Sequence, residues 1–190
     1  PIWSLKQRRI CDIARNSLKP AKQSALLYRI AKHYKCKHIL ELGTSLGITS
    51  SYLAHAGADE LVSFEGASEI VCKAKSNFEK QNLKNILVVE GNMDETLSAY
   101  LGNATGIDMA FIDGNHRKEP TLEYFRLLLE RSNADAVFVF DDIHWSREME
   151  DAWEEIKLQQ KVAVTIDLFF MGIAFVKKGF EEPVHCKIRM

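Results

Sequence analysis

The sequence predicts an α/β fold built on a mostly parallel, doubly wound β-sheet, and three observations indicate it. Short apolar runs alternate with segments of helical periodicity from Ile39 onward. The run Ala136–Phe140 is apolar at every position, as expected of a strand covered on both faces. The last two runs, residues 162–166 and 173–176, are joined too closely for a crossover helix, so they should be antiparallel neighbours.

The elements expected from periodicity follow one another along the whole chain. The expected helices cover residues 20–34, 48–56, 70–78, 91–101, 120–129 and 146–156. The expected strands cover residues 39–42, 61–65, 86–89, 107–112, 136–140, 162–166 and 173–176. Ile48, Tyr52 and Ala56 are expected on one face of the second helix. Ser146 suits the cap of the last helix.

The length of 190 residues fits one domain, with a basic helical segment over residues 1–37 and an α/β core over residues 38–190. The first segment carries ten Lys or Arg residues against the single acid Asp12, a net charge of +9. Because the net charge of the whole chain is −1, residues 38–190 carry −10. Such asymmetry can mark a nucleic-acid or anionic-substrate face. A solvated helix face is the favoured interpretation, because few aromatic residues are interleaved for base stacking.

Composition excludes several classes of protein. No apolar run approaches the roughly 20 residues needed to span a bilayer, and the first residues lack a signal-peptide pattern. The four cysteines are isolated, with no ligand-like spacing, and indicate reduced thiols. We therefore expect a cytoplasmic protein without a membrane association.

The most informative segment is residues 39–49, in which a strand, a glycine turn and the start of a helix are followed by Glu65 at the tip of the next strand. Gly43 and Gly47 would let the backbone approach a ligand, and Glu65 could accept from both hydroxyls of a ribose. Dinucleotide sites carry G-x-G-x-x-G, whereas three residues separate these two glycines. This spacing argues against an NAD-dependent oxidoreductase and makes S-adenosylmethionine (SAM) the leading candidate.

The segment Glu41–Gly47 resembles motif I of the class I SAM-dependent methyltransferases, and most of all the small O-methyltransferases that include the catechol type. Residues 64–65, 111–116 and 138–142 match further motifs of that family in order. The resemblance covers roughly residues 22–177. It implies a seven-stranded sheet in the order 3-2-1-4-5-7-6, with one antiparallel strand.

The resemblance also implies a cofactor site at the carboxyl ends of the strands. Glu41 would neutralise the ammonium of the methionine part, Glu65 would hold the ribose, and the residues after Gly91 would contact the adenine. The expected cofactor-binding residues are Glu41, Gly43, Thr44, Ser45, Gly47, Glu65, Gly91, Asn92, Met93 and Asp113. The alternative for Glu65 is a surface acid at a strand end.

Three carboxylates, those of Asp113, Asp141 and Asp142, are expected at the same edge, where they would repel one another without a cation. An all-oxygen set suits Mg²⁺ or another hard divalent ion. The metal-dependent relatives supply Asp, Asp and Asn, so Asp142 departs from their pattern but keeps an oxygen donor. The alternative is that Asp141 or Asp142 caps the following turn while Asp113 bonds a loop.

His116 lies three residues after Asp113, where the catechol-type enzymes place a lysine base. Histidine is well matched to proton abstraction at neutral pH, so His116 and Asp113 are the expected catalytic residues. His144 is a second candidate, as a base or a metal ligand. Either histidine could instead be a partly exposed hydrogen-bonding residue.

The expected function is SAM-dependent methyl transfer to a hydroxyl oxygen of a small molecule, with a homodimer left open. The alternatives are an RNA ribose methyltransferase and a non-catalytic SAM-binding domain. The segment Asp113–His116 lacks the two prolines typical of enzymes that methylate exocyclic base nitrogens. Two roles are open for four apolar residues near the last strands: they could form an apolar wall of the acceptor site, or they could simply pack in the core. These residues are Trp145, Phe169, Phe170 and Met171.

Overall fold

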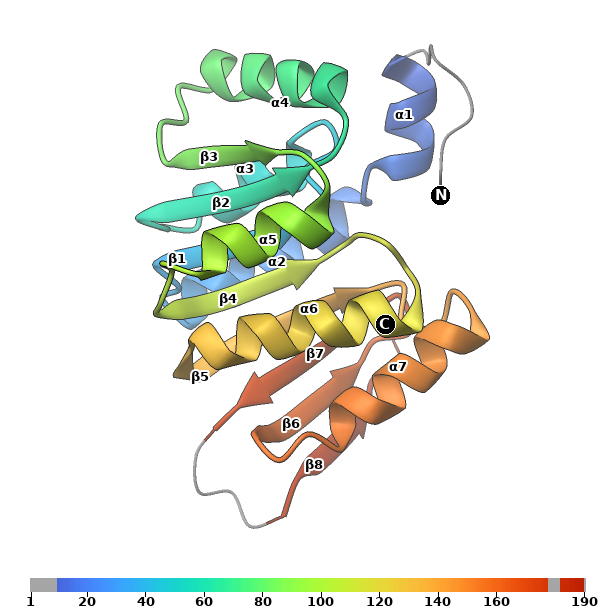
Figure 1. Cartoon of the computed structure of the whole chain (residues 1–190). Helices are drawn as coiled ribbons and strands as arrows, with labels where there is room; N and C mark the ends of the chain where they lie inside the picture. The colour runs from blue at the N-terminus through green and yellow to red at the C-terminus, as the bar shows by residue number, and fades with distance from the viewer. Residues whose placement is uncertain (1–9, 178–181, 190) are drawn as a thin grey trace.

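The computed structural model describes residues 10–177 and 182–189 and contains one mixed sheet (Figure 1). Its strands are β1 (His38–Leu42), β2 (Glu60–Glu65), β3 (Ile86–Glu90), β4 (Ile107–Ile112), β5 (Ser132–Asp141), β6 (Val162–Asp167), β7 (Met171–Val176) and β8 (Val184–Lys187). Its helices are α1 (Ile10–Ser17), α2 (Ala21–His33), α3 (Ile48–Ala54), α4 (Ser68–Lys80), α5 (Met93–Leu101), α6 (Lys118–Arg131) and α7 (Arg147–Lys157).

The strand order is β3-β2-β1-β4-β5-β7-β6-β8, which confirms the predicted order of the first seven strands. Strand β7 runs antiparallel to both β5 and β6, as predicted from the short connection before it. The eighth strand was not predicted. It pairs in parallel with β6, and all four of its residues are exposed, so no burial pattern marks it in the sequence.

Two elements differ from the sequence prediction in a way that burial explains. Strand β5 begins at Ser132 rather than Ala136, because its first four residues are not buried and apolarity identifies only the buried half. Helix α3 buries Ser50, Leu53 and Ala54, whereas the predicted face of Ile48, Tyr52 and Ala56 is only partly buried. The prediction of that helix face was therefore wrong.

Helices cover both faces of the sheet (Figure 1). Leu97 of α5, Phe125 of α6 and Trp153 of α7 are buried in one core cluster with sheet residues. Leu27 of α2 and Leu53 of α3 are buried in a second cluster on the other side. Burial at about 25 cal/mol per Å² of apolar surface makes these two layers the main source of stability.

This arrangement brings the carboxyl ends of β1, β2, β4 and β5 to one edge, because those strands are parallel neighbours. In Figure 1 helix α1 lies beside that edge. Lys6, Arg8 and Arg9 of the predicted basic segment lie outside the described residues. Within the described ranges, no helix combines the length and apolarity that crossing a membrane requires.

We expect Gly172→Ala in β7 to lower the free energy of unfolding by about 1–3 kcal/mol, as overpacking does. A Cβ at this position would lie 2.6 Å from Trp153 Cη2 in α7, so the ring of Trp153 must shift. Urea unfolding measures the cost. In a Trp153→Leu background the same substitution should cost much less, and an equal cost in both backgrounds would contradict this packing.

Candidate active site

The turn after β1 contains two glycines that the packing of the chain itself requires. Gly43 has φ +106°, and a Cβ there would lie 2.3 Å from the backbone oxygen of Asp113. Gly47 has φ +76°, and a Cβ there would lie 2.4 Å from Phe78 Cε1 in α4. An L side chain rarely adopts either conformation. The sequence predicted that both glycines let the backbone approach a ligand. The structure shows that each glycine also lies against another part of the chain.

A buried hydroxyl network joins this turn to β2. Thr44 Oγ1 and Ser63 Oγ lie 2.6 Å apart, and Ser63 Oγ donates to Glu41 Oε2 at 2.6 Å. Ser50 Oγ donates to the same carboxyl oxygen. The side chain of Thr44 points toward β2 in this network, and its predicted contact with the cofactor stays a prediction. Thr44 therefore supports the turn through its side chain.

Glu41 is fully buried, and its second carboxyl oxygen, Oε1, has no hydrogen-bond partner among the described residues. Burial raises the pKa of Glu41 to about 7, although the hydrogen bonds from Ser50 and Ser63 oppose the rise. A buried acceptor without a partner is costly unless something donates to it. A cationic group such as an ammonium would satisfy Oε1 and stabilise the ionised carboxylate.

Glu65 lies at the end of β2 and faces the turn. Its Oε2 accepts from the backbone N–H of Ser45 at 3.0 Å, and its Oε1 accepts from that of Ala67 at 3.1 Å. Each carboxylate oxygen can accept a further hydrogen bond, so two ribose hydroxyls remain acceptable ligands. Ser45 Oγ is buried without a partner among the described residues, which leaves a second unused polar atom at this turn.

The residues expected around the adenine follow β3 and are placed next to Glu65. The backbone N–H of Gly91 donates to the Glu65 carbonyl at 3.0 Å. Asn92 is exposed and caps α5 by accepting from the N–H of Asp94 at 3.3 Å. Met93 is partly buried and packs against the core. Their position fits the expectation, and adenine contact stays a prediction.

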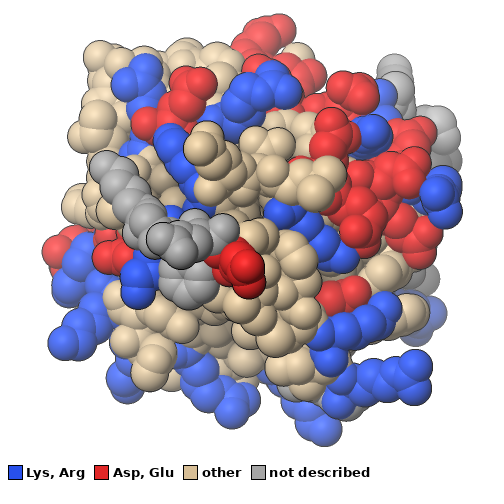
Figure 2. Space-filling view, turned by 90° about the horizontal axis from the view of Figure 1, so that it is seen from below, with Lys and Arg blue, Asp and Glu red and all other residues tan. Residues whose placement is uncertain are grey.

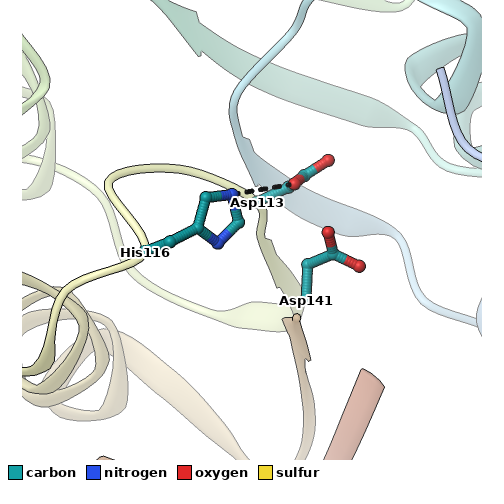
Figure 3. Close-up of side chains that lie close together, drawn as sticks. All are labelled: Asp113, His116 and Asp141. Carbon is teal, nitrogen blue, oxygen red and sulfur yellow. Dashed lines mark ion pairs between the residues drawn. The ribbon is translucent and has the colours of Figure 1, made fainter. Parts of the chain in front are cut away.

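Asp113 follows β4 and Asp141 ends β5, and His116 reaches the same place from the loop after β4 (Figure 3). One ligand atom from each residue lies within 4.8 Å of the other two. His116 Nε2 is 3.7 Å from Asp113 Oδ1. The predicted convergence of Asp113 and Asp141 is therefore present, together with the histidine expected to act as the base.

Lys19 is the residue that sequence reasoning missed. Its Nζ lies 2.9 Å from Asp113 Oδ2 and 2.5 Å from Asp141 Oδ2, and only 9% of its side chain is exposed. In the sequence it was one of ten basic residues assigned to a solvated helix face, an interpretation that is wrong for this residue. Since 122 positions separate Lys19 from Asp141, no local spacing could have indicated the contact.

Burial and neighbouring charges shift the pKa values of all three titratable groups in this cluster. Burial and the adjacent Asp113 raise the pKa of Asp141 to about 7, while Lys19 opposes the rise. Burial also raises the pKa of Asp113, against the attraction of Lys19. Burial lowers the pKa of His116, although Asp141 and Asp142 oppose this. A lowered pKa favours the neutral imidazole, the form that accepts a proton.

Asp142 and His144 are not part of this group of three side chains. The group of side chains close enough to share a metal ion contains Asp113, His116 and Asp141 but not Asp142. His144 lies between two other carboxylates, with Nδ1 3.2 Å from Glu150 Oε1 and Nε2 3.0 Å from Asp167 Oδ2. The structure therefore gives His144 hydrogen-bonding partners on α7 and β6, and the identity of the base stays a prediction.

The profile of a protein family described as "Methyltransferase domain" matches residues 40–143, which is more than half of the chain. The chain belongs to this family. The segment matched contains the turn after β1, Glu65, and the acidic ends of β4 and β5. The methyltransferase family predicted from the motifs is thereby confirmed.

Similar proteins support the same assignment. A catechol O-methyltransferase from Niastella koreensis is 28% identical over 125 residues, which cover 64% of this chain and 56% of that protein. The match thus spans little more than half the length of this relative. An O-methyltransferase from Bacillus cereus in complex with SAH superposes with a TM-score of 0.75 at 20% identity, covering 92% of this chain and 94% of the other.

A third similar protein is the O-methyltransferase TomG from Streptomyces achromogenes, in complex with SAM. It superposes with a TM-score of 0.74 at 21% identity, and the superposition covers 92% of each chain. At this level of identity the two solved structures establish the fold. The predicted α/β methyltransferase fold is therefore confirmed, and the edge that carries Gly43, Glu65 and Asp113 is its candidate active site.

We expect the Glu41 carboxyl to impose a pH dependence on stability in the absence of a ligand. Its pKa is about 7 in the folded protein and near 4.5 when unfolded, so unfolding releases a proton between these values. The free energy of unfolding of the natural chain, relative to Glu41→Gln, should fall as pH rises from about 4.5 to about 7, by up to about 1.4 kcal/mol per pH unit.

Urea unfolding at several pH values measures this difference. Glu60→Gln, an exposed substitution at the other end of β2, serves as the control and should leave the pH dependence unchanged. The free energy of unfolding of the natural chain minus that of Glu41→Gln could instead be independent of pH or increase with pH. Either result would contradict a buried, protonated Glu41.

Proposed function

We propose that this chain transfers the methyl group of SAM to a hydroxyl oxygen of a small molecule. The observation that carries the proposal is the pair of acidic acceptors at adjacent strand ends, Glu41 and Glu65, at the same edge of the sheet as His116. Membership of the methyltransferase family supports it. The names of the similar proteins, a catechol O-methyltransferase and two O-methyltransferases bound to SAH or SAM, support the cofactor and the oxygen acceptor.

In the proposed complex Glu65 binds the ribose of the cofactor and Glu41 binds its methionine part. Glu65 accepts from the ribose hydroxyls with its two remaining lone-pair positions, while keeping its bonds to the backbone of the turn. Glu41 Oε1 accepts from the ammonium of the methionine part and gains the partner that it lacks. Gly91, Asn92 and Met93 then lie on the adenine side, next to the end of β2.

The proposed reaction is a direct displacement, so the work of the protein is alignment and deprotonation. The acceptor oxygen forms a bond to the methyl carbon as the carbon–sulfur bond breaks, and the sulfonium becomes the neutral thioether of S-adenosylhomocysteine. The hydroxyl proton passes to His116 Nε2, which lies 3.7 Å from Asp113 Oδ1. Asp113 stabilises the imidazolium that results, because the two charges are opposite.

The divalent metal ion predicted at Asp113, Asp141 and Asp142 stays a prediction. The donor atoms of Asp113, His116 and Asp141 lie within 4.8 Å of one another, as a metal site requires. However, Lys19 Nζ contacts both carboxylates, at 2.9 and 2.5 Å. An ion bound to both would have to displace this ammonium, so the residues as arranged do not fit a metal ion.

A small aromatic or apolar acceptor is the proposed substrate class. Trp145 and Phe169 are 73% and 67% exposed on the loops that follow β5 and β6, and they can supply the apolar wall expected from the sequence. Met171 is fully buried and belongs to the core. Figure 2 shows acidic side chains gathered on the right of the face seen from below, with Lys and Arg side chains lying beside them and along the lower rim.

A cytoplasmic location and a homodimer stay predictions. The four cysteines of the chain are all free, which is consistent with a reducing compartment. Sedimentation analysis of the purified chain decides the oligomeric state.

We expect SAM and S-adenosylhomocysteine to raise Tm by roughly 5–11 °C at about 100 times Kd, since such saturation contributes about 2.7 kcal/mol. Thermal unfolding with and without ligand measures the shift. Glu65→Ala should remove most of it because the ribose loses its acceptor. Glu60→Ala, at the opposite end of β2, should keep it. A full shift with Glu65→Ala, or none with the natural chain, would refute the cofactor site.

We expect His116→Gln to reduce methyl transfer about 10²–10⁴-fold, the range that a general base contributes. Release of S-adenosylhomocysteine from a panel of phenols and catechols measures the rate. The thermal shift with S-adenosylhomocysteine should be preserved, because His116 is assigned to the acceptor side. If His144→Gln abolishes the reaction while His116→Gln leaves it intact, the assignment of the base is wrong.

A further inference from the structure

Lys19 occupies the place between the strand ends at which a cation is needed. Two carboxylates, Asp113 and Asp141, converge at the ends of β4 and β5, where they would repel each other if both were ionised. The ammonium of Lys19 lies within hydrogen-bonding distance of one oxygen from each. Among the residues that the structure describes, the only other cationic or ionisable base paired with Asp113 is His116.

The position of Lys19 is fixed by its surroundings. It directly precedes Pro20, the residue at the start of α2, and α2 buries Leu27 against the sheet. Its Nζ also lies 5.4 Å from the centre of the Phe111 ring in β4, within the range of a cation–π interaction. A side chain that is 9% exposed and held by three partners is part of the site and not a mobile surface lysine.

We propose that the ammonium of Lys19 takes the place of the divalent cation, so that this chain carries out its methyl transfer without a metal ion. Lys19 is a positioning residue: it holds Asp113 beside His116 and keeps the two carboxylates together. Removing it would leave the buried carboxylate of Asp141, the partly buried carboxylate of Asp113 and an imidazole within 4.8 Å, which is a donor set that binds Mn²⁺ or Mg²⁺. The effect on the rate rests on the proposed function; the effect on metal binding does not.

The test compares the natural chain with Lys19→Met and the matched control Lys22→Met. Lys22 is exposed in the first turn of α2, three residues from Lys19. Mn²⁺ binding is followed by electron paramagnetic resonance and by the change in Tm. We expect no specific Mn²⁺ binding by the natural chain or by Lys22→Met. Lys19→Met should bind one Mn²⁺, and a further Asp141→Asn substitution should abolish that binding.

The rate gives a second readout. Methyl transfer by the natural chain should be unchanged by EDTA. Lys19→Met should be at least 10-fold slower without metal and should recover part of that loss with Mg²⁺, whereas Lys19→Arg should stay insensitive to EDTA. If Lys19→Met does not fold, the natural chain and Lys19→Arg still decide the question, because both retain a cation.

Two results would overturn the proposal. One is a natural chain that binds a stoichiometric Mn²⁺ through Asp141. The other is methyl transfer that EDTA abolishes and Mg²⁺ restores. Failure of the proposed function is distinguishable, because it shows as an absence of the S-adenosylhomocysteine thermal shift while the Mn²⁺ titration still reports on the cation.

Discussion

The junction between the ends of β1 and β4 is the constraint on which the rest of the site depends. The backbone N–H of Asp113 donates to the Leu42 carbonyl at 2.9 Å, and the next residue, Gly43, leaves no room for a Cβ against the Asp113 carbonyl. This contact places the turn that would hold the cofactor directly against the loop that carries Asp113 and His116. Any side chain at position 43 would push the two apart.

From this junction the acids divide into two environments with different partners. Glu41 is buried against serine hydroxyls, and one of its oxygens has no hydrogen-bond partner within residues 10–177 and 182–189, which suits a cation brought by a ligand. Asp113 and Asp141 are paired with a cation that the chain supplies itself. Both environments are largely closed to water, so the charges in them are weakly screened and the choice of partner has a large energetic consequence.

Much of this could be predicted from the sequence because it is local. The glycine turn, Glu65 and the acid at the end of β4 each follow an apolar strand, and the parallel topology collects such residues at one edge. His116 was predicted from the resemblance to the catechol-type enzymes, which place a lysine base at this position, three residues after Asp113. Exposed strands gave no comparable signal: β8 and the first residues of β5 lack an apolar pattern, and both were missed.

The role of Lys19 could not be predicted because it depends on how the segment before α2 folds back across the sheet. The composition shows that residues 1–37 are basic, but it does not show which of the ten basic side chains is buried. The prediction of a metal ion at Asp113 and Asp141 stays a prediction, and Lys19 is a competitor for that place within the chain. Convergent carboxylates imply that a cation is present, but they do not specify whether it is a metal ion or an ammonium.

The most direct measurement is a crystal structure of the chain grown with S-adenosylhomocysteine and excess MgCl₂. The account predicts the ribose on Glu65, the methionine ammonium on Glu41, and Lys19 Nζ between Asp113 and Asp141 with no metal ion bound there. Magnesium bound to both carboxylates with Lys19 displaced, or a ligand bound away from Glu41 and Glu65, would contradict it.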